Sequence, residues 1–174
     1  RMTDKIIFRK AKLSDARGIA DVFCEGLRSK KFLYTGMNEY TAKKFANLKE
    51  YLKTANKKSG SRFFVAVDSS NKNILGTCNY DFRSDGRMRH KVSLGWSVHP
   101  DYFGKGIGTK LVSFAVRDAK KCGFKRAEAE AAMKNVGSWK LAQKLGFKIE
   151  GVKKKNMLLD NGRYDDVYVL GKLL

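Results

Sequence analysis

Three glycines at alternate positions mark the point where the chain must turn from a strand into a helix. Gly104, Gly106 and Gly108 follow a strand pattern that ends near the only proline, Pro100, and they precede apolar residues at helical spacing. Because glycine has no Cβ, this loop can turn several backbone N–H groups toward one point, and a helix N-terminus adds partial positive charge. The segment therefore predicts an anion cradle that holds a phosphate or pyrophosphate. An ordinary strand-to-helix turn is the alternative.

The spacing of these glycines excludes two common phosphate-binding loops. A Walker loop needs Gly-x-x-x-x-Gly-Lys followed by Ser or Thr, and a dinucleotide-binding fingerprint needs Gly-x-Gly-x-x-Gly early in a parallel strand–helix–strand unit. Residues 103–109 fit neither pattern. The predicted cradle therefore belongs to another class of anion site.

The segments around the loop alternate between strand and helix patterns. Strand patterns fall at residues 5–10, 62–67, 74–82, 89–98, 125–131, 147–152 and 164–174. Helical spacing of apolar residues falls at residues 19–27, 40–52, 107–122 and 136–145. We therefore expect an α/β (α+β) fold, with a mixed, mostly antiparallel central sheet of about seven strands flanked by about four helices. No internal repeat or linker interrupts it, so residues 2–174 are expected to form a single domain.

Charge and cysteine content narrow the class of protein. The 174 residues include 37 Lys and Arg against 17 Asp and Glu, a formal net charge of +20, and 43% are hydrophobic. This apolar content excludes a disordered basic tail, and no stretch approaches the roughly 20 consecutive apolar residues of a membrane span. The three cysteines are far apart and the two histidines stand alone. We therefore expect a soluble, cytoplasmic protein with no metal site and no membrane partner.

Two motifs together resemble the GNAT superfamily of acetyl-CoA-dependent N-acetyltransferases. Residues 98–111 look like its Arg/Gln-x-x-Gly-x-Gly/Ala pyrophosphate loop, and residues 135–147 look like its Asn-x-x-Ser/Ala…Lys-x-Gly-Phe segment. The order of strands and helices also follows the family over nearly the whole chain. The resemblance implies a GNAT fold, acetyl-CoA as co-substrate without a metal, and transfer of the acetyl group to a primary amine by direct attack in a ternary complex.

The resemblance also implies which residues hold acetyl-CoA. The amides of residues 104–109 are expected to bind the pyrophosphate, and the strand that ends at Val98 to offer backbone groups to the pantetheine amide and the thioester carbonyl. Asn135 is expected to contact the pantetheine arm, or else to act only as a helix N-cap. Phe103 stands where the family usually has Arg or Gln, and Lys105 or Lys110 is expected to compensate for that missing cation. The expected contacts are Trp96, Ser97, Val98, Phe103, Gly104, Lys105, Gly106, Ile107, Gly108, Thr109, Asn135 and Ser138.

Acetyl transfer needs a base, because amines arrive mostly protonated at neutral pH. Acidic and small side chains alternate along residues 126–131, so Glu128 and Glu130 fall on one face of a strand. The position of Glu130 relative to Asn135 resembles that of the catalytic Glu in ribosomal-protein alanine N-acetyltransferases, and we expect Glu130 to be the base. The alternative is that both glutamates face basic side chains of the neighbouring strand.

The resemblance defines the general acid and the acceptor contacts less closely. Many relatives have a Tyr where this chain has Ala142, which leaves Ser138, Tyr164 or solvent to protonate the leaving thiolate, and we take Ser138 as the second catalytic residue. Asp81 and Ser93 are candidates for handling the amine proton. The expected acceptor-binding residues are Phe32, Tyr34, Asp81, Glu128 and Tyr164, although the aromatic ones suit a core equally well.

The net charge supports a second hypothesis, a basic RNA- or ribosome-associated module that keeps the GNAT fold without catalysis. The lysine pairs lie on separate elements, however, and no RNA-reading aromatic motif accompanies them. Under the first hypothesis the acceptor is a protein N-terminus or a small amine, and the protein is a monomer or homodimer. The acceptor itself cannot be read from the sequence, because the residues that select it lie in variable loops.

Overall fold

The structure, a computed structural model, describes residues 6–29, 42–57 and 60–174, and the side chains of residues 42–45 are not described. Phe32 and Tyr34 therefore lie outside the described residues. The helices are α1 (Ala16–Arg28), α2 (Ala42–Thr54), α3 (Ile107–Lys121) and α4 (Val136–Lys144), with short 3-10 turns η2 (Leu13–Asp15) and η4 (Pro100–Tyr102). The strands are β1 (Ile6–Lys10), β2 (Ser61–Asp68), β3 (Ile74–Phe82), β4 (Lys91–Val98), β5 (Arg126–Ala132), β6 (Lys148–Leu158) and β7 (Tyr164–Leu173). Every predicted strand and helix is present.

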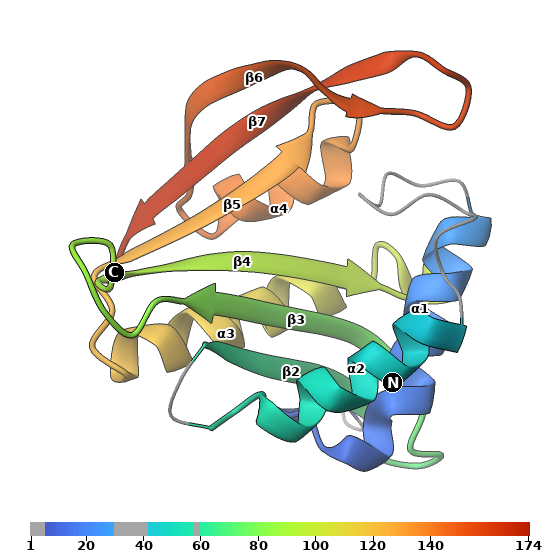
Figure 1. The fold of residues 1–174 in the computed structure, drawn as a ribbon. Helices are drawn as coiled ribbons and strands as arrows, with labels where there is room; N and C mark the ends of the chain where they lie inside the picture. Colours follow the sequence, from blue (N-terminus) through green and yellow to red (C-terminus); the bar gives the residue numbers. More distant parts are fainter. Residues whose placement is uncertain (1–5, 30–41, 58–59) are drawn as a thin grey trace.

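The strands form one seven-stranded sheet in the order β1-β2-β3-β4-β5-β7-β6 (Figure 1). Neighbouring strands are antiparallel except β4 and β5, which are parallel. The predicted mixed, mostly antiparallel sheet with four helices is therefore confirmed. The last hairpin, β6–β7, turns back so that β7 lies between β5 and β6.

Each face of the sheet packs against its own pair of helices. The helix α3 buries Leu111, Ala115 and Ala119 completely, and these residues recur at the helical spacing that the sequence predicted. They pack with buried residues of β2 to β5 in the main core, which Ala142 of α4 joins. On the opposite face α1 and α2 pack over β2 and β3 (Figure 1), with Ile19 and Val22 in a second core cluster.

The strand predicted over residues 147–152 is wrong at its end, because β6 continues to Leu158. The register of β6 with β7 shifts between Lys153 and Met157, and Lys155 has a positive φ of 47°. Residues 153–155 are three consecutive lysines, which lack the apolar alternation by which a strand is predicted. At the edge of a sheet, such a bulge lets charged side chains point into water while the pairing continues.

Among the described helices, none has the length and apolar content needed to cross a membrane.

Candidate functional site

The parallel pairing of β4 with β5 ends before either strand does. The register runs from Lys91↔Arg126 to Leu94↔Ala129, whereas β4 continues to Val98 and β5 to Ala132. Figure 1 shows the two strands diverging beyond this point. The sheet therefore opens between the second halves of β4 and β5.

Part of the β4 backbone directs N–H and C=O groups into this opening that are not hydrogen-bonded to β3. The His99 N–H donates to the Leu75 carbonyl (2.9 Å), and the register of β4 with β3 then runs without a break from Val98 to Val92. Residues bonded to an antiparallel partner alternate with residues that face away from it. Trp96 and Val98 therefore direct their N–H and C=O groups away from β3 and into the opening. This arrangement agrees with the expected role of the strand as a source of backbone contacts.

The glycine loop ends at the same opening. Gly104 and Gly106 have φ values of 75° and 76°, which favour glycine, and Gly106 is the N-cap of α3. The first helical hydrogen bond runs from the Lys110 N–H to the Gly106 carbonyl (3.1 Å). The amides of residues 107–109 precede it and have no acceptor within the helix. They form the positive end of α3, as expected of an anion cradle.

Gly108 allows α3 to approach β4 and α4 closely. A Cβ at this position would lie 2.8 Å from Leu141 Cδ1 and 3.3 Å from Val98 Cγ2. Gly108 is helical and needs no special φ, so its lack of a side chain is a packing requirement. It keeps the start of α3 in contact with the wall that α4 provides.

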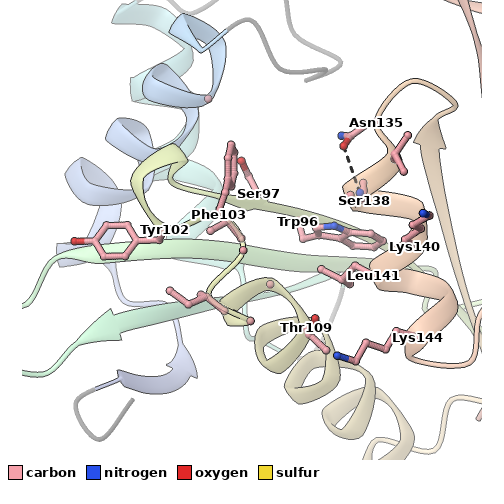
Figure 2. Close-up of a pocket in the computed structure, with 18 of the residues that line it drawn as sticks. Trp96, Ser97, Tyr102, Phe103, Thr109, Asn135, Ser138, Lys140, Leu141 and Lys144 are labelled. Carbon is pink, nitrogen blue, oxygen red and sulfur yellow. Dashed lines mark hydrogen bonds between the residues drawn. The ribbon is translucent and has the colours of Figure 1, made fainter. Parts of the chain in front are cut away.

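A cavity of about 720 Å³ fills the space between the glycine loop, β4 and α4 (Figure 2). Of the expected acetyl-CoA contacts it is lined by Trp96, Ser97, Val98, Phe103, Gly104, Gly106, Ile107, Gly108, Thr109, Asn135 and Ser138. Lys105 does not line it. Its ammonium donates to the Asp101 carbonyl (2.9 Å) and lies 4.8 Å from the centre of the Tyr102 ring. The glycine loop and α4, which are far apart in sequence, thus line a single cavity.

Sequence reasoning missed the basic wall of this cavity. Lys134, Lys140 and Lys144 line it together with Leu141, Val136 and Gly137. Residues 137, 140, 141 and 144 lie three or four apart and so share one face of α4, which the predicted helix already implied. Figure 2 shows Lys140 and Lys144 on the side of the cavity that faces α3. Neither Lys105 nor Lys110, the lysines expected to compensate for Phe103, lines the cavity.

Asn135 caps α4 as well as lining the cavity. Its Oδ1 accepts a hydrogen bond from the Ser138 N–H (3.3 Å), the dashed line in Figure 2. The segment before the helix is fixed by Trp139, whose Nε1 donates to the Met133 carbonyl (3.0 Å), and by Asp165, which accepts from the Lys134 N–H (3.2 Å). The N-cap interpretation is confirmed. It leaves the Asn135 amide nitrogen available to a ligand.

A second cavity, of about 330 Å³, opens on the other side of the gap between β4 and β5. Its polar side chains include those of Asn79, Asp81, Ser93, Glu130, Asn135 and Ser138. Trp96, Asn135 and Ser138 line both cavities. The two spaces therefore meet at these three residues.

Glu128 and Glu130 lie on one face of β5, as predicted, because Ala127, Ala129 and Ala131 between and beside them are buried on the other. The Glu128 carboxylate accepts hydrogen bonds from Lys91 (2.7 Å) and Arg126 (2.8 Å). Desolvation alone would raise the pKa of Glu128, but these two cations hold it below its usual value. Glu128 thus faces basic side chains, as the alternative interpretation predicted, and lines neither cavity.

Glu130 differs from Glu128 in its surroundings. Its carboxylate forms an ion pair with Lys153, which reaches across from β6, and it lines the second cavity. Both glutamates are therefore paired with cations, but only Glu130 lines a cavity.

Asp81 lies on β3, where two neutral side chains donate hydrogen bonds to its carboxylate. Its Oδ1 accepts a hydrogen bond from the Tyr51 hydroxyl (2.9 Å), and its Oδ2 accepts from Asn79 Nδ2 (3.3 Å). Desolvation raises the pKa of Asp81, and the Tyr51 hydrogen bond offsets only part of that rise. The pKa of the Tyr51 hydroxyl is raised to about 12, first by burial.

The remaining predicted site residues lie apart from the cavities. Tyr164 begins β7, is 56% exposed and lines neither cavity, so it belongs neither to the core nor to the opening. Ala142, at the position where many relatives have Tyr, is fully buried. Among the described residues, no three His, Cys, Asp or Glu side chains gather closely enough to hold a metal ion.

Solved structures confirm the fold. An acetyltransferase of the GNAT family from Streptococcus pneumoniae superposes with a TM-score of 0.83 at 24% identity, covering 98% of this chain and 100% of that chain. A GNAT superfamily phosphinothricin acetyltransferase from Sinorhizobium meliloti, in complex with AcCoA, superposes with a TM-score of 0.82 at 23% identity, covering 98% and 89%.

The sequence comparisons identify the family as well as the fold. L-amino acid N-acyltransferase MnaT of Escherichia coli (strain K12) is 38% identical over 84 residues, or 48% of this chain and 49% of that protein. The chain thus matches about half the length of this curated relative. The family model described as Acetyltransferase (GNAT) domain matches residues 5–148, which include the glycine loop, both cavities' lining on β4 and β5, and α4. The chain therefore belongs to the GNAT acetyltransferase family.

Proposed function

We propose that this protein transfers an acetyl group from acetyl-CoA to a primary amine, a small molecule or a protein N-terminus. The main support for the proposal is that basic groups line one of the two cavities at the opening in the sheet and acidic groups line the other. Three lysines and free helix amides line the larger cavity, whereas Asp81 and Glu130 line the smaller one. A polyphosphate fits the first environment and a protonated amine fits the second.

The larger cavity suits acetyl-CoA in shape and in charge. The amides of residues 107–109 are aimed at a pyrophosphate, Lys140 and Lys144 add cationic side chains, and Asn135 Nδ2 can donate to the pantetheine arm. The N–H groups of Trp96 and Val98 point toward the place where the arm would leave the cavity. Bound acetyl-CoA supplies the acyl group as a thioester.

The residues at the junction would carry the proton transfers. Glu130 accepts a proton from the ammonium group of the acceptor, directly or through one water, so that the nitrogen can attack the carbonyl carbon. The β4 N–H groups stabilise the negative charge that develops on the acyl oxygen. Ser138, which lines both cavities, is placed to give the departing sulfur a proton, with solvent as the other source.

The role of Glu130 is tested by Glu130→Gln, with Lys153→Met as its matched control. Both variants break the same ion pair, but only the first removes the base. We expect Glu130→Gln to lower kcat/KM for the amine by about a hundredfold, because a positioned base contributes 10²–10⁴-fold. Lys153→Met should stay within about threefold of the native protein, the effect of a half-exposed ion pair. Release of free CoA measures both, and equal losses in the two variants would refute the assignment.

Binding and activity assays on the native protein distinguish the acetyltransferase hypothesis from the hypothesis of an RNA-associated module. Acetyl-CoA should raise the melting temperature, and a panel of primary amines should release CoA from it. If acetyl-CoA neither binds nor turns over, while RNA binds with a steep dependence on salt, the proposed function fails.

A further inference from the structure

Asp81 has no cationic partner within the described part of the chain, although Lys and Arg outnumber Asp and Glu by 37 to 17. The two glutamates on the same face of the sheet are paired, Glu128 with Lys91 and Arg126, and Glu130 with Lys153. The two oxygens of Asp81 accept only from neutral donors, Tyr51 and Asn79. A carboxylate has about four acceptor sites, so about two remain for a ligand.

Asp81 is aimed into the smaller cavity by the register of the sheet. It lies opposite Ser93, and Asn79 lies opposite Gly95, so these four positions share one face. Ser93 pairs in turn with Glu128, which puts Glu130 on that face as well. Among the described residues that line this cavity there is no Lys or Arg. The cavity therefore carries two carboxylates, of which Glu130 is paired with Lys153 and Asp81, among the described residues, with no cation.

The distance from Asp81 to the reaction centre follows from strand geometry. Strands lie about 4.8 Å apart and rise about 3.3 Å per residue, so Asp81 is roughly 8 Å from Gly95, the residue after the last β4–β5 pair. Asp81 is exposed, so a soluble cation can reach its carboxylate. Its neutral hydrogen bonds hold the carboxylate in place without neutralising it.

We infer that the acceptor is a primary amine with a second cationic group, and that Asp81 binds that second charge while Glu130 faces the reacting nitrogen. The inference rests on the proposed function. A chain of four to five methylene groups spans roughly 6–8 Å, so a linear diamine of that length joins the two positions. A free α-amino acid would instead bring its own carboxylate next to Glu130 and Asp81, and like charges at that separation repel.

The test compares two acceptors of equal length, 1,4-diaminobutane and 1-aminobutane, on two variants. Asp81→Asn keeps the shape of the side chain and its Tyr51 hydrogen bond. Asp85→Asn removes the same charge from the exposed β3–β4 turn, away from both cavities. We expect Asp81→Asn to raise KM for the diamine by at least about tenfold and KM for the monoamine by less than about threefold, because a charge-assisted contact is lost only with the diamine. KM for acetyl-CoA should not change, and Asp85→Asn should behave as the native protein.

Several outcomes would overturn the inference. One is equal loss for both amines, which would place Asp81 at the reacting nitrogen, and another is a native protein that prefers methionine or 1-aminobutane to the diamine. Calorimetric binding of 1,4-diaminobutane to the CoA-bound protein tests Asp81 without turnover. If the diamine binds and Asp81→Asn weakens it but no acetyl transfer occurs, the proposed function fails while the cation site stands. If acetyl transfer occurs and the diamine binds both proteins equally, the cation site fails alone.

Discussion

Gly108 shows how much of the site depends on the absence of one side chain. A methyl group there would meet Leu141 at 2.8 Å, inside the wall of the larger cavity. We expect Gly108→Ala to lower the free energy of unfolding by about 1–2 kcal/mol, because overpacking forces neighbours to shift. It should also weaken acetyl-CoA binding if Leu141, which lines the larger cavity, shifts into it. Thermal unfolding and calorimetric titration with acetyl-CoA measure the two effects.

Gly137 provides the control for that substitution. It lies in α4, lines the same cavity, and a Cβ there would meet nothing within 4 Å. Gly137→Ala should therefore stabilise the protein by up to about 1 kcal/mol, the usual gain in a helix interior. A Gly108→Ala protein as stable as Gly137→Ala, with unchanged affinity for acetyl-CoA, would contradict the packing argument.

Single residues also show how much of the site could be predicted from the sequence. Alternation along β5 correctly placed Glu128 and Glu130 on one face. It could not separate them, because their partners Lys91 and Lys153 lie 37 and 23 residues away in sequence and reach them only through the folded sheet. Position relative to the opening, rather than spacing, distinguishes the two glutamates.

Among the elements, the junction of β1 with α1 depends on one ion pair. Asp15 is 8% exposed, pairs with Arg9 (2.7 Å) and accepts from the Lys12 N–H (2.7 Å). Burial alone would raise the pKa of Asp15, but Arg9 and the amide together hold it below its usual value. A depressed pKa means that this contribution to stability is present above the unfolded value of about 3.9 and is lost as the pH falls through the folded value.

Replacing Arg9 tests this junction. Arg9→Leu should lower the free energy of unfolding at pH 7 by about 1–3 kcal/mol, because it removes both hydrogen bonds that Arg9 donates to the buried Asp15 carboxylate. The difference from the native protein should shrink below about pH 4, where Asp15 becomes protonated in the variant and in the unfolded chain. Urea unfolding between pH 3 and 7 measures it. Arg28→Leu, which breaks an exposed pair with Glu25, should give a small difference that does not vary in this way.

The order of strands and helices along the chain could be predicted from the sequence. Which strands pair in the sheet could be predicted only in part. Periodicity and turn residues located each strand and helix, and the glycine loop fixed the start of α3. Nothing local placed β7 between β5 and β6, because that arrangement depends on pairing over long range. The length of β6 was misjudged for a related reason, since lysines 153–155 are typical of a loop unless an edge strand carries them.

On the scale of the whole molecule, the net charge of +20 would act in opposite ways on the two proposed substrates. It attracts the phosphates of acetyl-CoA and repels a dicationic acceptor, and salt screens both effects. We expect kcat/KM for acetyl-CoA to fall several-fold, roughly three to ten times, between 50 and 300 mM NaCl. For 1,4-diaminobutane kcat/KM should hold steady or rise. Parallel decreases for both substrates would show that salt acts on the protein in general.

Composition alone could not separate these effects. Basic residues occur on many elements of the chain, and the structure places three of them, Lys134, Lys140 and Lys144, on one cavity wall. The acidic residues of the other cavity are a small minority of the charges, and only the fold brings Asp81 and Glu130 to the same space. Local surroundings, rather than the total charge, therefore define each substrate's environment.

The three residues that line both cavities have a consequence for the kinetic order of the reaction. Because Trp96, Asn135 and Ser138 belong to both spaces, whatever occupies the larger cavity forms part of the wall of the smaller one. An acceptor that arrives first meets an incomplete site, while one that arrives second is enclosed. The catalytic cycle should therefore be compulsory in its sequence: acetyl-CoA binds before the amine, and free CoA is the last product to leave.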